Sequence, residues 1–191
     1  MNQEKLNKYI QRAYETAVRH GFHDKSLPMQ HWLMLVITEV AEMVEADRKG
    51  KHAQVEMFKR ESITPQPKEN REKHWCFCFE TFIKDSFEDE MADICIRLFD
   101  LAGLMGWKIE PLDMTLFMNR YQELYNGMTI TEKAYRLCQL FTYLHQDETV
   151  VQLAIPFLEC MAKESSIDLE WHIAQKMEYN AQRGRLHGKK Y

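Results

Sequence analysis

Several features that would place this chain in a familiar class are scarce or missing. Among 191 residues there are only seven glycines and five prolines, so few strong turn signals interrupt the sequence and long helices are favoured. No run of about 18 uncharged residues occurs, and a membrane-spanning segment is therefore not expected. A formal net charge of −4 also gives no support to a general nucleic-acid binder.

Cysteine is also sparse, with five residues scattered along the chain. An odd and scattered set does not form a disulfide framework, and it favours a reducing, cytoplasmic location. Cys76 and Cys78 form a C-x-C pair near His74 in "HWCFCFE", which resembles part of a zinc site but lacks a second ligand pair. The alternative for these cysteines is that they are buried free thiols.

The residues that are abundant indicate a folded helical protein. Hydrophobic residues make up 45% of the chain and aromatic residues 12%, which argues against disorder. Apolar residues recur at helical spacing, and no useful length of sequence alternates as a β-strand does. The length suits one domain, or one core with an appended subdomain. We therefore predict a single all-α domain over residues 1–191, built as a helical bundle.

Turn signals divide the chain into predicted helices. They span about 3–20, 28–48, 79–105, 111–127, 131–146, 148–165 and 168–184. Pro156 is expected to kink or split the sixth of them. After the second helix, a polar, basic stretch that contains Pro65 and Pro67 predicts a flexible insertion over residues 50–75.

The predicted helix over 28–48 places carboxylates where a core-facing surface is expected. On a helical wheel, Glu39 lies within about 60° of apolar residues that include Val36 and Met43. Glu42 lies at the edge of the same apolar sector. Because burying an unpaired carboxylate costs several kcal/mol, a compensating group is expected beside these two acids.

The third predicted helix repeats this arrangement in "FEDEMADICIRLFDLAG". Glu90 is surrounded on its wheel by apolar residues such as Ile94, and Asp93 lies about 60° away. Each helix therefore carries two carboxylates one turn apart, near enough to share a cation. If the two apolar stripes face each other, Glu39, Glu42, Glu90 and Asp93 converge in one partly apolar cleft.

Four converging carboxylates need positive charge, because like charges repel and raise one another's pKa values. Oxygen-only ligation suits Mg²⁺ or Mn²⁺, and Mg²⁺ keeps coordination positions for water and phosphate oxygens. A di-iron site fits less well, since it uses Glu-x-x-His pairs and neither motif here has the histidine. Solvated acidic faces are the other alternative. Further carboxylates, expected at the surface or in support of the ligands, are Asp85, Glu88, Asp89 and Asp100.

These acids resemble the signature of the MazG-like all-α nucleoside triphosphate pyrophosphatases, a superfamily with dimeric dUTPase and dCTP pyrophosphatase relatives. The signature is Glu-x-x-Glu followed by Glu-x-x-Asp on the next helix, and the matching residues are Glu39, Glu42, Glu90 and Asp93. The similarity covers about residues 1–105 and 168–191, whereas the additional helices of 111–162 carry no recognised motif. The spacer 43–89 is longer than is usual in the family, which leaves base selectivity open.

The resemblance implies hydrolysis of a (deoxy)nucleoside triphosphate to the monophosphate and pyrophosphate, in nucleotide-pool clean-up. It implies the four acids as ligands of Mg²⁺, with Mn²⁺ as a substitute, and Glu39 and Glu42 as the catalytic pair. Glu39, in the more apolar surroundings, is expected to accept a proton from the attacking water. The resemblance also implies a homodimer, although the helices of 111–162 are an alternative source of the missing half of a bundle.

The C-terminal sequence "KMEYNAQRGRLHGKKY" resembles the closing segment of the same family. Lys176, Asn180 and Arg183 stand at the matching positions and, being spaced by four and three, share one helix face. The resemblance implies that they bind phosphate oxygens of the substrate. The alternative is a solvated basic face. Under the resemblance, the following "RGRLHGKKY" is a mobile tail whose His187, Lys189 or Lys190 closes over substrate.

A nucleotide base needs an apolar wall or a stacking partner. Trp32, two turns before the first acid on the same face, and its neighbour His31 are the leading candidates, with Phe22 and Trp75 as further ones. Core packing is the alternative for each of them. Arg97, one turn after the last acid, is expected to form an ion pair with the acidic residues, with phosphate contact as the alternative.

Two other functions are compatible with the same residues. The protein is then either a nucleotide sensor with weak turnover, which uses the pocket to change assembly, or a structural or regulatory helical protein whose acids are solvated. Intact acids at all four positions argue against the loss of catalysis.

Overall fold

The computed structural model describes residues 1–143 and 147–188, and within these ranges the chain is all-α, with nine α-helices and no strand. The predicted fold class is confirmed. The α-helices are α1 (Gln3–Arg19), α2 (Met29–Arg48), α3 (Val55–Ser62), α4 (Arg71–Phe82), α5 (Phe87–Met105), α6 (Met114–Tyr125), α7 (Ile130–Tyr143), α8 (Thr149–Glu164) and α9 (Leu169–Gln182). Two 3₁₀ turns accompany them, η1 (Lys68–Asn70) and η2 (Arg185–Gly188). The end of one predicted helix, at 144–146, and the tail residues Lys189 and Lys190 lie outside the described residues.

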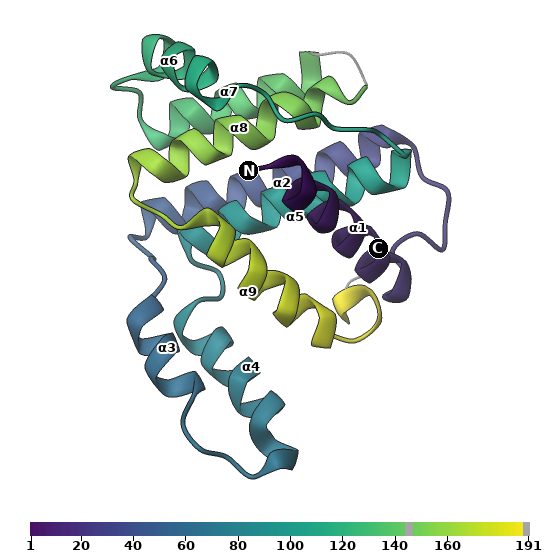
Figure 1. Ribbon diagram of the computed structural model, residues 1–191, viewed down its shortest axis with the longest axis vertical. Helices are drawn as coiled ribbons and strands as arrows, with labels where there is room; N and C mark the ends of the chain where they lie inside the picture. The colour runs from purple at the N-terminus through teal and green to yellow at the C-terminus, as the bar shows by residue number, and fades with distance from the viewer. Residues whose placement is uncertain (144–146, 189–191) are drawn as a thin grey trace.

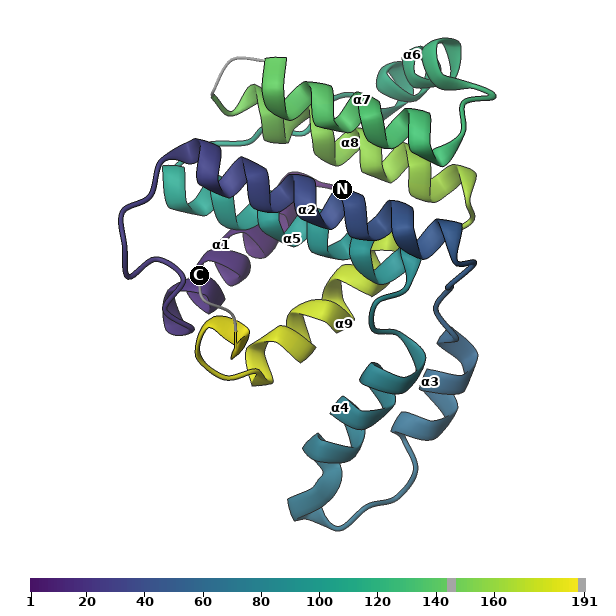
Figure 2. The ribbon, with the colours of Figure 1, turned by 180° about the vertical axis from the view of Figure 1, so that it is seen from behind.

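Helix α5 is the centre of the fold. It packs against α1, α2, α8 and α9, and it lies in the middle of both ribbon views (Figures 1 and 2). Core residues such as Met91, Ile94 and Leu98 are completely buried along it. Because protein surrounds α5 on most sides, the acidic residues near its N-terminus face other side chains rather than bulk water.

A second layer of helices covers the pair formed by α2 and α5. Helix α7 packs on α2, and α8 packs on α5, with α6 against the outside of α8 (Figure 1). Pro156 lies buried inside α8, which continues through it from Thr149 to Glu164. Of the two outcomes expected for this proline, a kink or a split, the split does not occur, because the buried packing of α8 holds the turns on both sides.

The predicted helix over 79–105 is wrong as a single element, because a turn separates α4 from α5. Asp85 in this turn has φ of 58°, in the left-handed region that a helix cannot use. The side chain of Ser86 accepts the Asp89 N–H and caps α5. The Asp89 carboxylate in turn accepts the N–H of Asp85 at 2.9 Å, so both sides of the turn are fixed.

The segment 50–75, predicted as a flexible insertion, contributes to a helical hairpin formed by α3 and α4, which projects from the body of the protein (Figure 1). The hairpin has a core of its own, in which Phe58 packs against Trp75 and Phe79. Tyr179 of α9 completes this core by stacking on Phe79, with ring centroids 4.6 Å apart. The helical part of this polar stretch forms because a few apolar residues pack against partners on α4 and α9, which local composition does not show.

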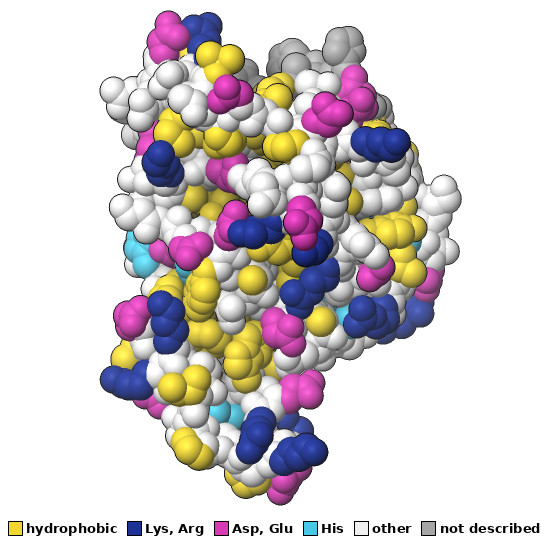
Figure 3. All heavy atoms as spheres, viewed as in Figure 1, with side chains coloured by type: hydrophobic (Ala, Val, Ile, Leu, Met, Phe, Trp, Pro, Cys, Tyr) yellow, Lys and Arg dark blue, Asp and Glu magenta, His cyan; other side chains and the backbone are white. Residues whose placement is uncertain are grey.

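The surface of the protein is of mixed character. Basic and acidic side chains are interspersed on the face shown in Figure 3, and hydrophobic side chains gather where α9 meets the α3–α4 hairpin. None of the helices in the described part of the chain combines the length and the apolarity that a membrane span needs.

Candidate metal centre

Three of the four signature acids come together between α2 and α5. Glu39 and Glu42 project from successive turns of α2, and Glu90 projects from the first turn of α5. Each offers a carboxylate oxygen, and these oxygens all lie within 4.8 Å of one another. The arrangement gives an oxygen-only group of the kind that binds hard divalent cations.

The three acids differ in their access to water. Glu42 is exposed, whereas Glu39 is 4% and Glu90 only 3% exposed. One oxygen of Glu90, Oε2, is buried and has no hydrogen-bond partner among the described residues. A buried acceptor without a partner is costly, and a cation or a proton at this oxygen would remove the cost.

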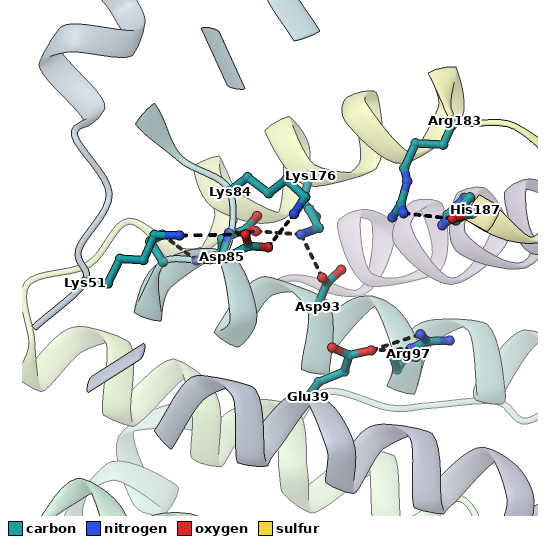
Figure 4. Close-up of polar contacts among 11 residues, drawn as sticks. Glu39, Lys51, Lys84, Asp85, Asp93, Arg97, Lys176, Arg183 and His187 are labelled. Atoms are coloured by element: carbon teal, nitrogen blue, oxygen red, sulfur yellow. Dashed lines mark hydrogen bonds and ion pairs between the residues drawn. The ribbon is translucent and has the colours of Figure 1, made fainter. Parts of the chain in front are cut away.

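Asp93, the fourth signature acid, does not join that trio, and it forms an ion pair with Lys176 of α9. The ammonium nitrogen lies 2.7 Å from a carboxylate oxygen of Asp93 (Figure 4). It lies 2.6 Å from a carboxylate oxygen of Asp89. Lys176 is only 4% exposed, so the alternative of a solvated basic face does not hold for this residue. This buried lysine holds two acids of α5 beside the trio.

Glu39 has an internal cation as well. Both Nε and Nη2 of Arg97 lie 2.9 Å from the same oxygen, Oε1 of Glu39 (Figure 4). The ion pair expected for Arg97 is therefore present, and it joins α2 to α5. Two of the four signature acids are thus paired with a basic side chain of the same chain.

The electrostatics of the centre follow from burial and from like charges. Burial, with the charge of Asp93 added, raises the pKa of Glu90 to about 9. Burial and Asp93 likewise raise the pKa of Glu39, although Arg97 opposes the shift. Burial raises the pKa of Asp89 to about 6 even beside Lys176. The centre therefore favours either bound protons or an added cation at neutral pH.

A pocket of about 70 Å³ adjoins the acids, between α1, α5 and α9. Its polar lining residues are Thr16, Glu39, Asp93, Arg97, Asp100, Asn180, Arg183 and His187. Its apolar lining residues are Ala13, Ala17, Phe22, Ile96 and Met177. Pockets for whole drug-sized ligands measure about 300–1,000 Å³, so this one has room for a phosphate group but not for an entire nucleotide.

The other residues of the predicted phosphate-binding segment lie at this pocket. Asn180 is 8% exposed, and its Oδ1 has no hydrogen-bond partner among the described residues. Arg183 lies over the ring of Tyr179, 5.6 Å from its centroid, and donates a hydrogen bond to the carbonyl of His187 at 3.2 Å (Figure 4). Asn180 and Arg183 therefore face the same space as Glu39, which agrees with their shared helix face.

Trp32 and His31, the leading candidates for a base-binding wall, are not among the residues that line the pocket. Trp32 is 7% exposed in the main core, where its ring packs edge-on against His23 and His31. Core packing, the alternative for Trp32, is what the structure shows. Phe22 does line the pocket, whereas Trp75 belongs to a separate groove at the hairpin.

Three acids expected at the surface are buried, so that alternative is wrong for them. Glu88 accepts hydrogen bonds from His52 and from a backbone N–H, and Asp100 pairs with His23 at 2.7 Å. Asp89, 1% exposed, forms a second acidic group with Asp85 and Glu90. The sequence signal for this group was the capping pattern Ser-x-x-Asp at the start of α5, which places these acids at a helix N-terminus.

The cysteine pair belongs to no cluster of three or more metal ligands among the described residues. Cys76 donates to the side chain of Gln182 at 2.7 Å, whereas Cys78 lies 3.6 Å from His74. The two thiols, two residues apart on α4, have different neighbours, and no group of metal ligands among the described residues includes them. Both are free thiols, and Cys78 is buried whereas Cys76 is half-buried, so the alternative of buried free thiols holds in full for Cys78 alone.

Fold and centre together define an all-α protein with a carboxylate cluster beside a small pocket lined by both acidic and basic side chains. Comparison of the chain with protein-family models, with curated proteins and with solved structures gives no match. The resemblance to the MazG-like pyrophosphatases therefore rests on the motifs in the sequence.

Proposed function

We propose that this protein is a Mg²⁺-dependent nucleoside triphosphate pyrophosphatase, which hydrolyses a (deoxy)nucleoside triphosphate to the monophosphate and pyrophosphate in the cytoplasm. The observation that carries the proposal is the convergence of Glu39, Glu42 and Glu90, whose carboxylate oxygens lie within 4.8 Å of one another. Two of the three, Glu39 and Glu90, are buried, and a bundle core gains nothing from acids so close together, because their mutual repulsion opposes folding.

The residues of the centre fit a divalent cation. All its donors are carboxylate oxygens, and the buried Oε2 of Glu90 has no hydrogen-bond partner among the described residues. Glu39, Glu42 and Glu90 would hold Mg²⁺, or Mn²⁺ in its place, with Asp93 next to them. A bound cation of this kind supplies charge neutralisation on the phosphates and lowers the pKa of a coordinated water.

The remaining chemistry falls to side chains around the pocket. Asn180 and Arg183 line the pocket and would orient phosphate oxygens. The guanidinium of Arg183 suits phosphate best, because its planar fork donates two hydrogen bonds at once. Lys176 holds Asp93 in position through their buried ion pair. Glu39 is the proposed acceptor of the proton from the attacking water, since burial and Asp93 raise its pKa.

The proposed assembly is a homodimer, in line with the resemblance. In the alternative, one chain completes its own bundle through the packing of α7 on α2 and of α8 on α5. Sedimentation equilibrium separates a mass of one chain from a mass of two.

Pyrophosphate release from a panel of canonical and modified triphosphates, with Mg²⁺ or with chelator, tests the activity. Glu42→Gln is expected to reduce the rate at least about 100-fold, as the loss of one group that stabilises transition-state charge does. Its matched control is Glu45→Gln, which changes the next carboxylate of α2, paired with Arg48 on the surface, and leaves the rate unchanged. Nucleotide binding without release would support a sensor, and neither binding nor release would support a structural role.

A further inference from the structure

The ion pair between Arg97 and Glu39 occupies the same carboxylate that the proposed cation needs. Nε and Nη2 of Arg97 both lie 2.9 Å from Oε1 of Glu39. Glu39 also belongs to the group whose oxygens lie within 4.8 Å of one another. A guanidinium on one oxygen of this carboxylate and a divalent cation draw on the negative charge of the same buried acid, so each weakens the binding of the other.

The two internal cations of the centre are enclosed to different degrees. The Lys176 side chain is 5% exposed and touches two carboxylates, so moving it would leave two acids unpaired. The Arg97 side chain is 23% exposed, pairs with one acid, and lines the pocket. Arg97 is therefore able to move into the pocket while Lys176 stays in place.

A displaced guanidinium would find no free carboxylate on the pocket wall. The lining acids besides Glu39 are Asp93 and Asp100, and each already has a partner. Lys176 pairs with Asp93 at 2.7 Å, and His23 pairs with Asp100 at 2.7 Å. A phosphate group in this pocket would be the acceptor best suited to the planar fork of Arg97.

We propose that Arg97 exchanges partners during substrate binding: it competes with the divalent cation for Glu39 and, once displaced, donates its hydrogen bonds to the triphosphate. This inference rests on the proposed pyrophosphatase function and deepens it. Arg97 neutralises Glu39 in the metal-free protein and neutralises phosphate in the loaded one. Cation binding then prepares the phosphate site, because it releases the arginine that the phosphate needs.

The first test measures cation binding without nucleotide, by titrating Mn²⁺ into wild-type protein and variants and following free Mn²⁺ by electron paramagnetic resonance. Arg97→Met removes the rival and is expected to tighten Mn²⁺ binding at least about tenfold. The matched control is Arg183→Met, which removes the same charge from the same pocket but frees no carboxylate. It is expected to tighten binding less than about threefold, through long-range charge alone.

The second test measures phosphate binding with inorganic tripolyphosphate in the presence of saturating Mn²⁺. Arg97→Met is expected to weaken this binding about tenfold, and Arg97→Lys, which keeps the charge but not the fork, to restore part of it. A purely structural ion pair predicts the opposite pattern for the metal, since its loss disturbs Glu39 and weakens Mn²⁺ binding. Equal Mn²⁺ affinities for Arg97→Met and Arg183→Met would overturn the proposal.

A measurement on the wild-type protein keeps the test independent of variant folding. The Nε–H resonance of Arg97 in nitrogen-15 spectra is expected to shift, and its hydrogen to exchange faster, as Mg²⁺ saturates the site. A resonance that stays unchanged at saturation contradicts the exchange of partners. If wild-type protein neither binds Mn²⁺ nor releases pyrophosphate, the proposed function fails; if it does both and only the arginine results disagree, this inference fails alone.

Discussion

Replacing Glu90 by glutamine is expected to stabilise the metal-free protein above neutral pH, although it alters a signature acid. Glu90 is 3% exposed, and its pKa is raised from 4.5 to about 9 by burial first and by Asp93 second. Between these values the folded chain keeps a proton that the unfolded chain releases. The free energy of unfolding therefore falls as the pH rises from about 4.5 to about 9, and this contribution is fully present only below the lower value.

The size of the effect follows from the same shift. One proton of difference costs about 1.4 kcal/mol per pH unit, so an upper limit at pH 8 is about 5 kcal/mol. Relaxation of the structure and water penetration reduce such penalties, and we expect Glu90→Gln to gain about 2 kcal/mol at pH 8. At pH 4 the two proteins should be equally stable within about 0.5 kcal/mol, since wild-type Glu90 is then protonated in both states.

Urea unfolding with chelator at pH 4, 6 and 8 measures this dependence. The control is Glu42→Gln, which changes the exposed member of the same group and should move stability by less than about 0.5 kcal/mol. Millimolar Mg²⁺ should stabilise the wild-type protein more than Glu90→Gln, because the variant offers the cation a neutral amide in place of a carboxylate. The reasoning is refuted if Glu90→Gln is less stable than wild type at pH 8, or if the difference does not grow with pH.

Two further changes test the packing around the centre. Lys176→Met leaves Asp89 and Asp93 without their buried partner and should lower the free energy of unfolding, measured in urea at pH 8, by about 3–5 kcal/mol. A decrease below about 1 kcal/mol would show that the two ion pairs of Lys176 do not stabilise the fold. Gly103→Ala would stabilise an uncrowded helix, but here the added Cβ lies 2.5 Å from the Cβ of Tyr14, so the free energy of unfolding should fall by about 1–3 kcal/mol. The control is Gly184→Ala, whose added Cβ has no atom within 4 Å. Equal melting temperatures for the two variants would contradict the close approach of α1 and α5.

Periodicity was enough to predict the helical class and the main acidic pairs. The apolar sector around Glu39 and the one around Glu90 both proved to be core-facing, and the two acids are 4% and 3% exposed. This works because a 3.6-residue repeat fixes which side chains share a helix face before any tertiary contact is known. The meeting of the two sectors followed from the packing of α2 on α5.

Contacts between residues far apart in the sequence could not be predicted from local sequence patterns. Asp89 was expected at the surface or in support of the ligands, because no residue near it in the sequence indicates its ion pair with Lys176 of α9. The segment 50–75 looked polar, yet Phe58 is buried by residues of α4 and α9. Trp32 was predicted to contact the nucleotide base, but its ring packs in the main core. In each case a contact across the chain decided burial, which propensity does not encode.

Helix α9 contacts both the α3–α4 hairpin and the pocket beside the acids. Tyr179 stacks on Phe79 and donates a hydrogen bond to Glu80 of the hairpin at 2.7 Å, while the next residue, Asn180, lines the pocket. Rotation of α9 about its axis would therefore disturb both sides at once. A shortened chain that lacks α3 and α4 would expose aromatic rings of α9 to water and allow the helix to rotate. The α3–α4 hairpin therefore helps to fix the orientation of the α9 residues that face the acids.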